Sequence, residues 1–483
     1  MNTYFIWIIN RHIILVFLSI ISSVDLSAQN PDVVFTFHVR GVYDSKITLL
    51  TPGHLGYYEQ FREIQTIRNG ETTRIVIPKD FLPGEFIVRF DYKVKETSTP
   101  YPSEKFIFIN DQDLELWVNP VYCNNLDSTY FQKNESENTM FAMFSEENTR
   151  RKEKLGLLQN FLMNYDDQKS LFYQEGIKEY EQRRQAYNQW LTEYHQKDKK
   201  LFVSILYQFE YVPQIPWTGT ETDRIISLIN HYFDFIDFNN PLIVKFSDLN
   251  KWMDNYVNLF GQLSTTTALL DSLIPEAGRT AIEKAKEGHP LVYGWMVDYF
   301  FRGFESNIIT SGMKILEPYL NDPNCLTTKR LEINRRLEGM KTLLPGTKAP
   351  DITLKDPEGN PFNLYSYTPP CNYILLLFWS AGCSHCLETV DNLYPWQQQK
   401  ENQRKINIVA VGLDETDTDI MKWRDKIRAF PAWKHFGEPK GVSSKVANDF
   451  YVLSTPVMIL LNSKTKEIVA IPNTLQELIR AVQ

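Results

Sequence analysis

The stretch that most constrains the fold runs from Tyr373 to Trp396 and reads YILLLFWSAGCSHCLETVDNLYPW. It opens with an apolar run, Tyr373–Trp379, which is too short to span a membrane and is typical of a strand buried on both faces. Three small residues follow, then the motif CSHC at 383–386, and then apolar residues at helical spacing. The pattern predicts a strand, a tight turn, and a helix whose first turn carries both thiols.

The position of the two cysteines predicts thiol chemistry. A thiol at a helix N-terminus lies beside unpaired N–H groups and the positive end of the helix dipole, which lowers its pKa from about 8.5 towards 7. Cys383 stands at the turn and is predicted to be the exposed, attacking thiolate. Cys386 follows on the same helix face and is predicted to resolve the mixed disulfide. A metal site is not expected, because no second CxxC and no paired histidines follow.

Three landmarks around these cysteines carry a family resemblance. FWSAGCSHC, which begins at Phe378-Trp379, resembles the FWAxWCxxC signature of thioredoxin-like proteins. The lead-in PGTKAPDITL at 345–354 is similar to the G-x-x-A-P-D-x-x-L opening of the thiol-specific antioxidant superfamily. Thr455-Pro456, before an apolar run, resembles the cis-proline turn that faces the CxxC in this fold. From Leu344 onward the chain resembles the TlpA branch of thiol–disulfide oxidoreductases.

The resemblance implies an enzyme that exchanges disulfides with protein or small-molecule thiol partners. Electrons would arrive from or leave to another thiol protein, and no cofactor is implied. His385 gives a C-x-H-C motif like that of disulfide isomerases. A donor or cation beside the thiolate stabilises the reduced form, so we expect a couple more oxidising than thioredoxin.

The chain departs from the family pattern at several positions. Thioredoxins carry a buried Asp where this chain has Leu377, and TlpA-like proteins often carry a Glu where it has Thr389. Neither usual proton carrier for Cys386 is therefore present. Glu388 is close in sequence but belongs to a different helix face, and it or a water is left to serve. Gly382 replaces the second signature Trp, which is expected to open the surface beside Cys383.

Two rival functions stay open. The first is a thiol peroxidase. Ser380, three residues before Cys383, fits the peroxiredoxin pattern, but Leu376 stands where peroxiredoxins have a proline. The other rival is a binding module with a vestigial redox site, whose N-terminal domains do the main work. The missing proton carriers slightly favour this second rival.

Composition and the N-terminal residues bear on the partners of the protein and on its location in the cell. The net charge is −8 and basic residues are scattered, so nucleic acid is not an expected partner. Five cysteines in 483 residues are too few for a disulfide scaffold. An apolar run after Arg11 and a small-residue site before Gln29 predict a signal peptide over 1–28. The protein is expected to be exported to the periplasm, with membrane association as the alternative.

The rest of the chain predicts a multidomain protein in three folded parts. Residues 29–122 show alternating strands with recurrent turn signals and predict a β-sandwich. Residues 123–342 predict a helical domain, in which the aromatic stripe of Tyr180, Tyr187, Trp190 and Tyr194 is expected to face the core, with a partner groove as the alternative. Residues 343–483 predict a thioredoxin-like α/β domain with helices over 386–399, 417–428 and 474–482. The sequence does not say whether Cys123 and Cys325 pair, whereas Cys371 lies too far along its strand to join the CxxC.

Overall fold

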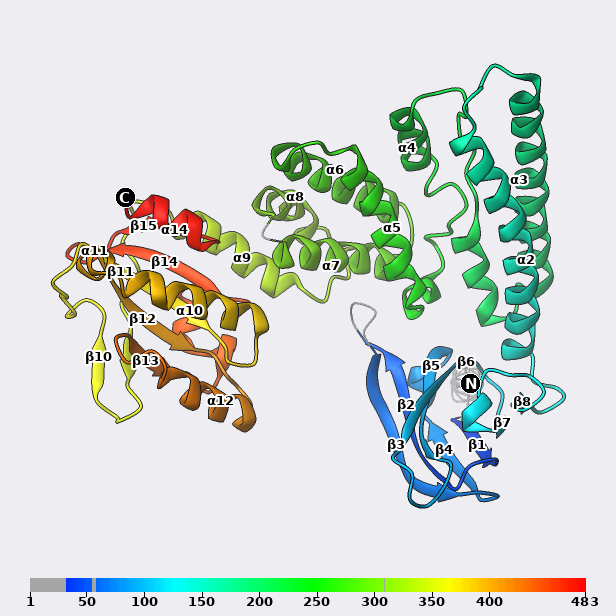
Figure 1. Ribbon diagram of the computed structural model, residues 1–483, viewed down its shortest axis with the longest axis horizontal. Coiled ribbons are helices and arrows are strands. Elements are labelled where there is room, and N and C mark those ends of the chain that lie inside the picture. The colour runs from blue at the N-terminus through cyan, green and yellow to red at the C-terminus, as the bar shows by residue number, and fades with distance from the viewer. Residues whose placement is uncertain (1–31, 54–57, 308) are drawn as a thin grey trace, which may run out of the picture. The chain divides into compact units, whose positions relative to one another are not determined.

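The computed structural model describes residues 32–53, 58–307 and 309–483, and divides into two compact units, Met1–Leu259 and Phe260–Gln483 (Figure 1). The predicted signal peptide over 1–28 lies outside the described residues. The predicted fold class is confirmed, with a β-rich N-terminal region, a helical region and a C-terminal α/β domain with a mixed sheet. The predicted domain boundaries stay predictions, and the two units meet within helix α5 (Asp248–Leu263).

The N-terminal region consists of two four-stranded sheets that share one core, with strand orders β4-β1-β7-β8 and β3-β2-β5-β6. Alternate residues of β1, such as Phe35 and Phe37, are fully buried and meet residues of β2 and β5 such as Ile47 and Phe86. This alternation gives the half-buried strands that the sequence predicts. The strands are β1 (Val33–Val39), β2 (Asp44–Pro52), β3 (Tyr58–Arg68), β4 (Thr72–Ile77), β5 (Gly84–Lys93), β6 (Tyr101–Ile109), β7 (Leu114–Val118) and β8 (Tyr130–Phe131).

Two long helices follow and pack against each other through aromatic side chains. Tyr180, Tyr187 and Trp190 of α3 are buried, so the predicted core role of this stripe is confirmed. The side chain of Asn138, on α2, exchanges hydrogen bonds with the backbone of Phe108 on β6, which joins the helices to the sheets. The helical elements of this unit are α2 (Glu137–Asn164), α3 (Leu171–Asp198), η4 (Phe202–Glu210), α4 (Glu221–Asn230) and η5 (Pro241–Lys245), followed by α5.

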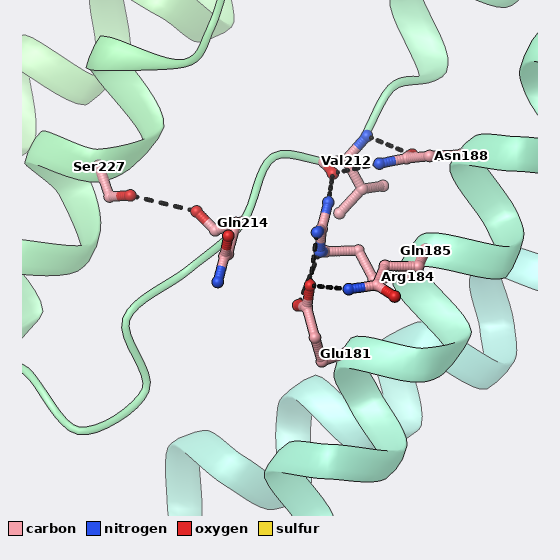
Figure 2. Close-up of polar contacts among 7 residues, drawn as sticks. All are labelled: Glu181, Arg184, Gln185, Asn188, Val212, Gln214 and Ser227. Carbon is pink, nitrogen blue, oxygen red and sulfur yellow. Dashed lines mark hydrogen bonds and ion pairs between the residues drawn. The ribbon is translucent and has the colours of Figure 1, made fainter.

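A polar cluster on α3 holds the loop that leads from η4 to α4 (Figure 2). Arg184 donates from Nε and Nη2 to the Glu181 carboxylate at 2.8 and 2.6 Å, and from Nη1 to the Val212 carbonyl at 2.9 Å. Asn188 forms two bonds with the backbone of the same valine, at 2.8 and 3.1 Å. These contacts satisfy loop backbone groups that no helix or strand would pair.

The second unit begins with helices and ends with the α/β domain. Its helices before that domain are α6 (Thr267–Lys286), α7 (Pro290–Ser306), α8 (Thr310–Leu320) and α9 (Arg330–Thr342). In the part of the chain that the structure describes, no helix has the length and apolar character needed to cross a membrane.

The α/β domain has a five-stranded sheet of order β13-β12-β11-β14-β15. Strands β11, β12 and β13 are parallel, β14 is antiparallel to β11, and β15 is antiparallel to β14. Side chains of the central strand β11 alternate between two apolar cores, one on each face, as its unbroken apolar run predicts. Leu375, Leu377 and Trp379 face the core that contains residues of α10, α12 and α14. Ile374, Leu376 and Phe378 face the other core.

The elements of this domain are β9 (Thr353–Lys355), β10 (Pro361–Asn363), β11 (Tyr373–Trp379), α10 (Ser384–Gln397), α11 (Lys400–Lys405), β12 (Ile406–Gly412), α12 (Asp417–Ile427), β13 (Lys434–Gly437), η6 (Gly441–Ser443), α13 (Lys445–Asp449), β14 (Val457–Asn462), β15 (Ile468–Ala470) and α14 (Leu475–Ala481). The predicted helix over 386–399 begins earlier than expected, at Ser384, which places Cys383 at its cap.

Candidate active site

Cys383 is the N-cap residue of α10, directly after the turn that ends β11. Its backbone is extended, with φ −102°, and its sulfur accepts a hydrogen bond from the N–H of Cys386 at 3.2 Å. The side chain is partly exposed. A negative charge on a sulfur in this position is stabilised, because the sulfur accepts a hydrogen bond from a helix N–H and lies at the positive end of the helix dipole.

Cys386 lies in the apolar core beneath Cys383 and is fully buried. Burial raises the pKa of its thiol, and a hydrogen bond with Cys383 raises it further. Val390 and Leu393, on the next turns of the helix, belong to the same core. The two thiols therefore differ in environment, since Cys383 is partly exposed and Cys386 is buried.

A buried carboxylate holds the turn before the cysteines. Oδ1 of Asp414 accepts hydrogen bonds from Ser380 Oγ at 2.6 Å, from Ala381 N at 2.8 Å and from Gly382 N at 3.4 Å. Asp414 is 4 % exposed, and burial raises its pKa. Its Oδ2 has no hydrogen-bond partner among the described residues.

The sequence pattern did not single out Asp414, although a signal was present. It follows the apolar run that forms β12, and β12 is parallel to β11. The carboxyl ends of neighbouring parallel strands meet at one edge of a sheet, so a polar residue after either strand lies near the CxxC turn.

The loop at Thr455-Pro456 faces Cys383 across 72 residues of sequence. The Cys383 thiol lies 3.7 Å from the carbonyl oxygen of Thr455, and the Thr455–Pro456 peptide bond is cis. Thr455 and Pro456 are partly exposed, and Val457 begins β14. The structure thus brings together the two cysteines and this loop.

His385 and Glu388 lie on the solvent side of α10. His385 Nδ1 is 3.8 Å from Glu388 Oε2, and the two side chains are 67 % and 72 % exposed. Cys386, in contrast, is buried in the core, so this rotamer of Glu388 does not reach it. The Thr389 hydroxyl donates to the His385 carbonyl at 2.9 Å.

Two further positions occupy the floor and the rim of the site. Trp379 is fully buried at the end of β11, and its Nε1 has no partner within the described part of the chain. Gly382 is exposed, and a Cβ at this position would lie 3.0 Å from Asp419 Cγ, so the Asp419 carboxylate lies beside the position where the family signature has its second Trp. The expected open surface beside Cys383 stays a prediction.

The other cysteines do not join this site. All five cysteines lie in the described residues and are free thiols. Cys371 donates to the Tyr373 carbonyl at 3.1 Å, and burial raises its pKa. Cys123 and Cys325 are each buried, Cys123 in the core of the N-terminal sheets and Cys325 beside the helices of the second unit.

Comparison with known proteins agrees with this arrangement. The family model of thioredoxin-like proteins matches residues 372–468, and the predicted resemblance of the C-terminal domain is thereby confirmed. No curated protein sequence matches the chain significantly.

Several solved structures from Bacteroides species resemble the chain. A thioredoxin-like protein from Bacteroides caccae has 20 % identity and a TM-score of 0.37, over 56 % of this chain and 96 % of its own. The thioredoxin domain of a thiol-disulfide oxidoreductase from Bacteroides vulgatus has 26 % identity and a TM-score of 0.25, over 29 % of this chain and 96 % of its own. A thiol-disulfide oxidoreductase from Bacteroides fragilis has 23 % identity and a TM-score of 0.25, over 28 % and 96 %.

Proposed function

We propose that the chain is an exported thiol–disulfide oxidoreductase that exchanges disulfides with protein or small-thiol partners through Cys383 and Cys386. The observation that carries the proposal is the placement of the thiols. Cys383 caps α10 with its sulfur 3.2 Å from a helix N–H and partly exposed, while Cys386 is buried beneath it. The thioredoxin-like match over 372–468 supports thiols and disulfides as the general class of partner. Export is proposed on the signal-peptide pattern of residues 1–28.

Exchange proceeds in two displacement steps. The Cys383 thiolate attacks one sulfur of a substrate disulfide, the substrate S–S bond breaks, and the departing substrate thiolate takes a proton from solvent. The Cys386 thiol then loses its proton and attacks Cys383 in the mixed disulfide. This forms the Cys383–Cys386 bond and releases the second substrate thiol. The protein has then lost two electrons and the substrate has gained them, and the same steps run in reverse when an oxidised protein meets a dithiol.

The surroundings of Cys386 bear on the second step. Because burial raises the pKa of Cys386, little of it is ionised at neutral pH, and its attack needs a proton acceptor. Water or Glu388 in another rotamer is the proton acceptor that we propose for it. Trp379 fills the floor of the site, and the Thr455–Pro456 loop offers its backbone to the substrate.

His385 is proposed to make the couple more oxidising. It stabilises the thiolate of the reduced state and has little to interact with in the disulfide. A redox titration against glutathione tests this role. His385→Pro should lower the potential by roughly 30 mV for each tenfold shift in the equilibrium, and an unchanged potential would refute it.

The function is tested by exchange kinetics on the purified full chain. Reduced wild type should react with a cystine-bridged peptide, Cys383→Ser should lose the reaction, and Cys371→Ser should retain it as a matched control. Cys371 is suited to this role because it carries a partly buried thiol outside the CxxC. Wild type without exchange, or Cys383→Ser with the wild-type rate, would refute the proposal and favour a binding module.

A further inference from the structure

The loop that presents Thr455 to Cys383 is held from outside the α/β domain by helix α9. Nη2 of Arg335 lies within hydrogen-bond distance of three carbonyl oxygens, those of Val442 at 3.3 Å, Ala447 at 3.0 Å and Val452 at 2.9 Å. These residues belong to η6, to α13 and to the segment just before Ser454. One side chain therefore ties together the whole path that leads from the end of β13 to the loop facing Cys383.

A second helix reaches the loop itself. Glu305, near the C-terminal end of α7, accepts a hydrogen bond at Oε1 from the Ser454 hydroxyl at 3.3 Å. Its Oε2 lies 3.1 Å from Nε of Arg336 on α9, and the two side chains are 15 % and 30 % exposed. Ser454 directly precedes Thr455, whose carbonyl lies 3.7 Å from the Cys383 sulfur. The carboxylate is thus one residue away from the backbone group that faces the nucleophile.

A close backbone approach completes the contact. Gly339 of α9 lies against Tyr451, and a Cβ at Gly339 would be 2.7 Å from the Cβ of that tyrosine. Tyr451 itself has a positive φ of 51°, a conformation that side chains rarely adopt. Only a residue without a side chain allows the helix to come this near. Arg335, Glu305 and Gly339 therefore contact the segment 451–455 at three points.

We propose that Arg335 on α9 and Glu305 on α7 are positioning residues that hold the segment 452–455 for the substrate site. The substrate class that this favours is an extended peptide segment beside a disulfide. Such a segment can pair its backbone with an exposed strand-like loop, and backbone pairing is sensitive to where that loop lies. A small disulfide needs only access to the Cys383 sulfur. This inference rests on the proposed function and deepens it.

The test compares two substrates on the full chain. The peptide substrate is a cystine-bridged peptide, and the small substrate is dithiobis(nitrobenzoate). Arg335→Met should lower the rate constant with the peptide by about tenfold, since misplacing a positioning group by an ångström can cost up to about a hundredfold. The rate with the small disulfide should change less than about twofold. Glu305→Ala should show the same pattern more weakly, and Arg335→Lys should restore most of the peptide rate.

Matched controls lie on α9 and on α8, which packs against it. Arg330, also on α9, donates to the Cys325 carbonyl, and Glu317 of α8 pairs with Lys341. Arg330→Met and Glu317→Gln should leave both rates near those of wild type. An unchanged peptide rate in Arg335→Met, or an equal loss with both substrates, would overturn the inference. If Arg335→Met does not fold, Glu305→Ala decides by the same criterion.

A separate readout distinguishes this inference from the proposed function. Wild type that exchanges with neither substrate would refute the function alone. Amide hydrogen exchange in the segment 451–455 still reports on positioning. Arg335→Met should accelerate this exchange most, and Glu305→Ala and Arg335→Lys should accelerate it less. Protection in Arg335→Met equal to that of wild type would overturn the inference irrespective of activity.

Discussion

Two arginines each fasten a loop to a helix, one in each unit, and their partners differ. Arg184 on α3 binds both oxygens of Glu181 as well as the Val212 carbonyl (Figure 2). Arg335 on α9 directs one nitrogen at three carbonyl oxygens, and no carboxylate pairs with it among the described residues. The pKa values reflect this contrast. The hydrogen bonds that Arg184 donates to Glu181 raise the pKa of Arg184, whereas burial lowers the pKa of Arg335.

The contrast indicates different roles for the two arginines. The charge of Arg184 is balanced by a bidentate carboxylate, and the third bond of its guanidinium goes to a loop carbonyl far from the cysteines in sequence, as in a contact that stabilises the fold. The charge of Arg335 is balanced only by carbonyl dipoles, and these carbonyls lead to the loop at Cys383. Removing Arg184 should therefore reduce stability, and removing Arg335 should mainly affect exchange with a peptide.

The largest expected effect is on the stability of the first unit. Arg184→Met leaves the Glu181 carboxylate with Gln185 as its donor and the Val212 carbonyl with Asn188, and should lower the free energy of unfolding by about 2 kcal/mol. This figure is reduced from that of a fully buried pair because the Glu181 side chain is 25 % exposed. Thermal and denaturant unfolding measure it, with Arg183→Met, from an exposed ion pair on the same helix, as control. The exchange rate should not change, and a loss of exchange in Arg184→Met would break the comparison.

A smaller effect is expected from lysine at the two positions. Arg184 uses three different nitrogens in a planar fork, which an ammonium group cannot reproduce, so Arg184→Lys should cost about 1 kcal/mol of stability. Arg335 uses one nitrogen for three acceptors, and an ammonium group offers three donors. Arg335→Lys should therefore keep the peptide exchange rate within about threefold of wild type. If lysine changed neither the free energy of unfolding nor the peptide exchange rate at either position, the different hydrogen-bond geometry of the two arginines would have no consequence.

The strand and helix at the CxxC could be predicted from sequence, because their signals are local. An apolar run of seven residues, three small residues and helical spacing define β11 and α10 without reference to the rest of the chain. Strand β13 escaped prediction, since its four residues form a strand only by pairing with β12. The segment KHFG has no alternation long enough to be recognised.

The contacts around the site required the tertiary structure. Asp414 reaches the CxxC turn only because β11 and β12 pair in a register that brings Trp379 beside Gly412. Arg335 and Arg336 form a basic pair that on sequence alone looks like a solvated helix face. Their contacts with 442–452 and with Glu305 depend on how α7 and α9 pack against the α/β domain, which no local pattern encodes.

The smallest expected effect is a difference in acid sensitivity. The pKa of Glu181 is lowered, chiefly by its hydrogen bonds with Arg184. A carboxyl group with a depressed pKa in the folded state stabilises the fold above its unfolded pKa of about 4.3, and this stability is lost as pH falls through the folded pKa. Glu181→Gln should therefore flatten the decline in stability between about pH 5 and 3.

Its control is Glu175→Gln, from an ion pair in which both side chains are 66 % exposed. The Arg335 contact involves only carbonyl oxygens, which do not titrate. Arg335→Met should therefore leave the decline of the unfolding free energy with falling pH unchanged. Unfolding by denaturant at a series of pH values measures all three variants. If the free energy of unfolding fell equally with pH in wild type and Glu181→Gln, the ion pair in Figure 2 would not make the Arg184 contact more sensitive to acid than the Arg335 contact.

The measurement that most directly tests the central claim is capture of the mixed disulfide. Cys386→Ser cannot complete the second displacement, so it should accumulate a covalent adduct with a cystine-bridged peptide at neutral pH. Mass mapping should place the peptide on Cys383, and Cys383→Ser should form no adduct under the same conditions. An adduct carried by Cys371, or no adduct in Cys386→Ser, would contradict the assignment of Cys383 as the attacking thiolate.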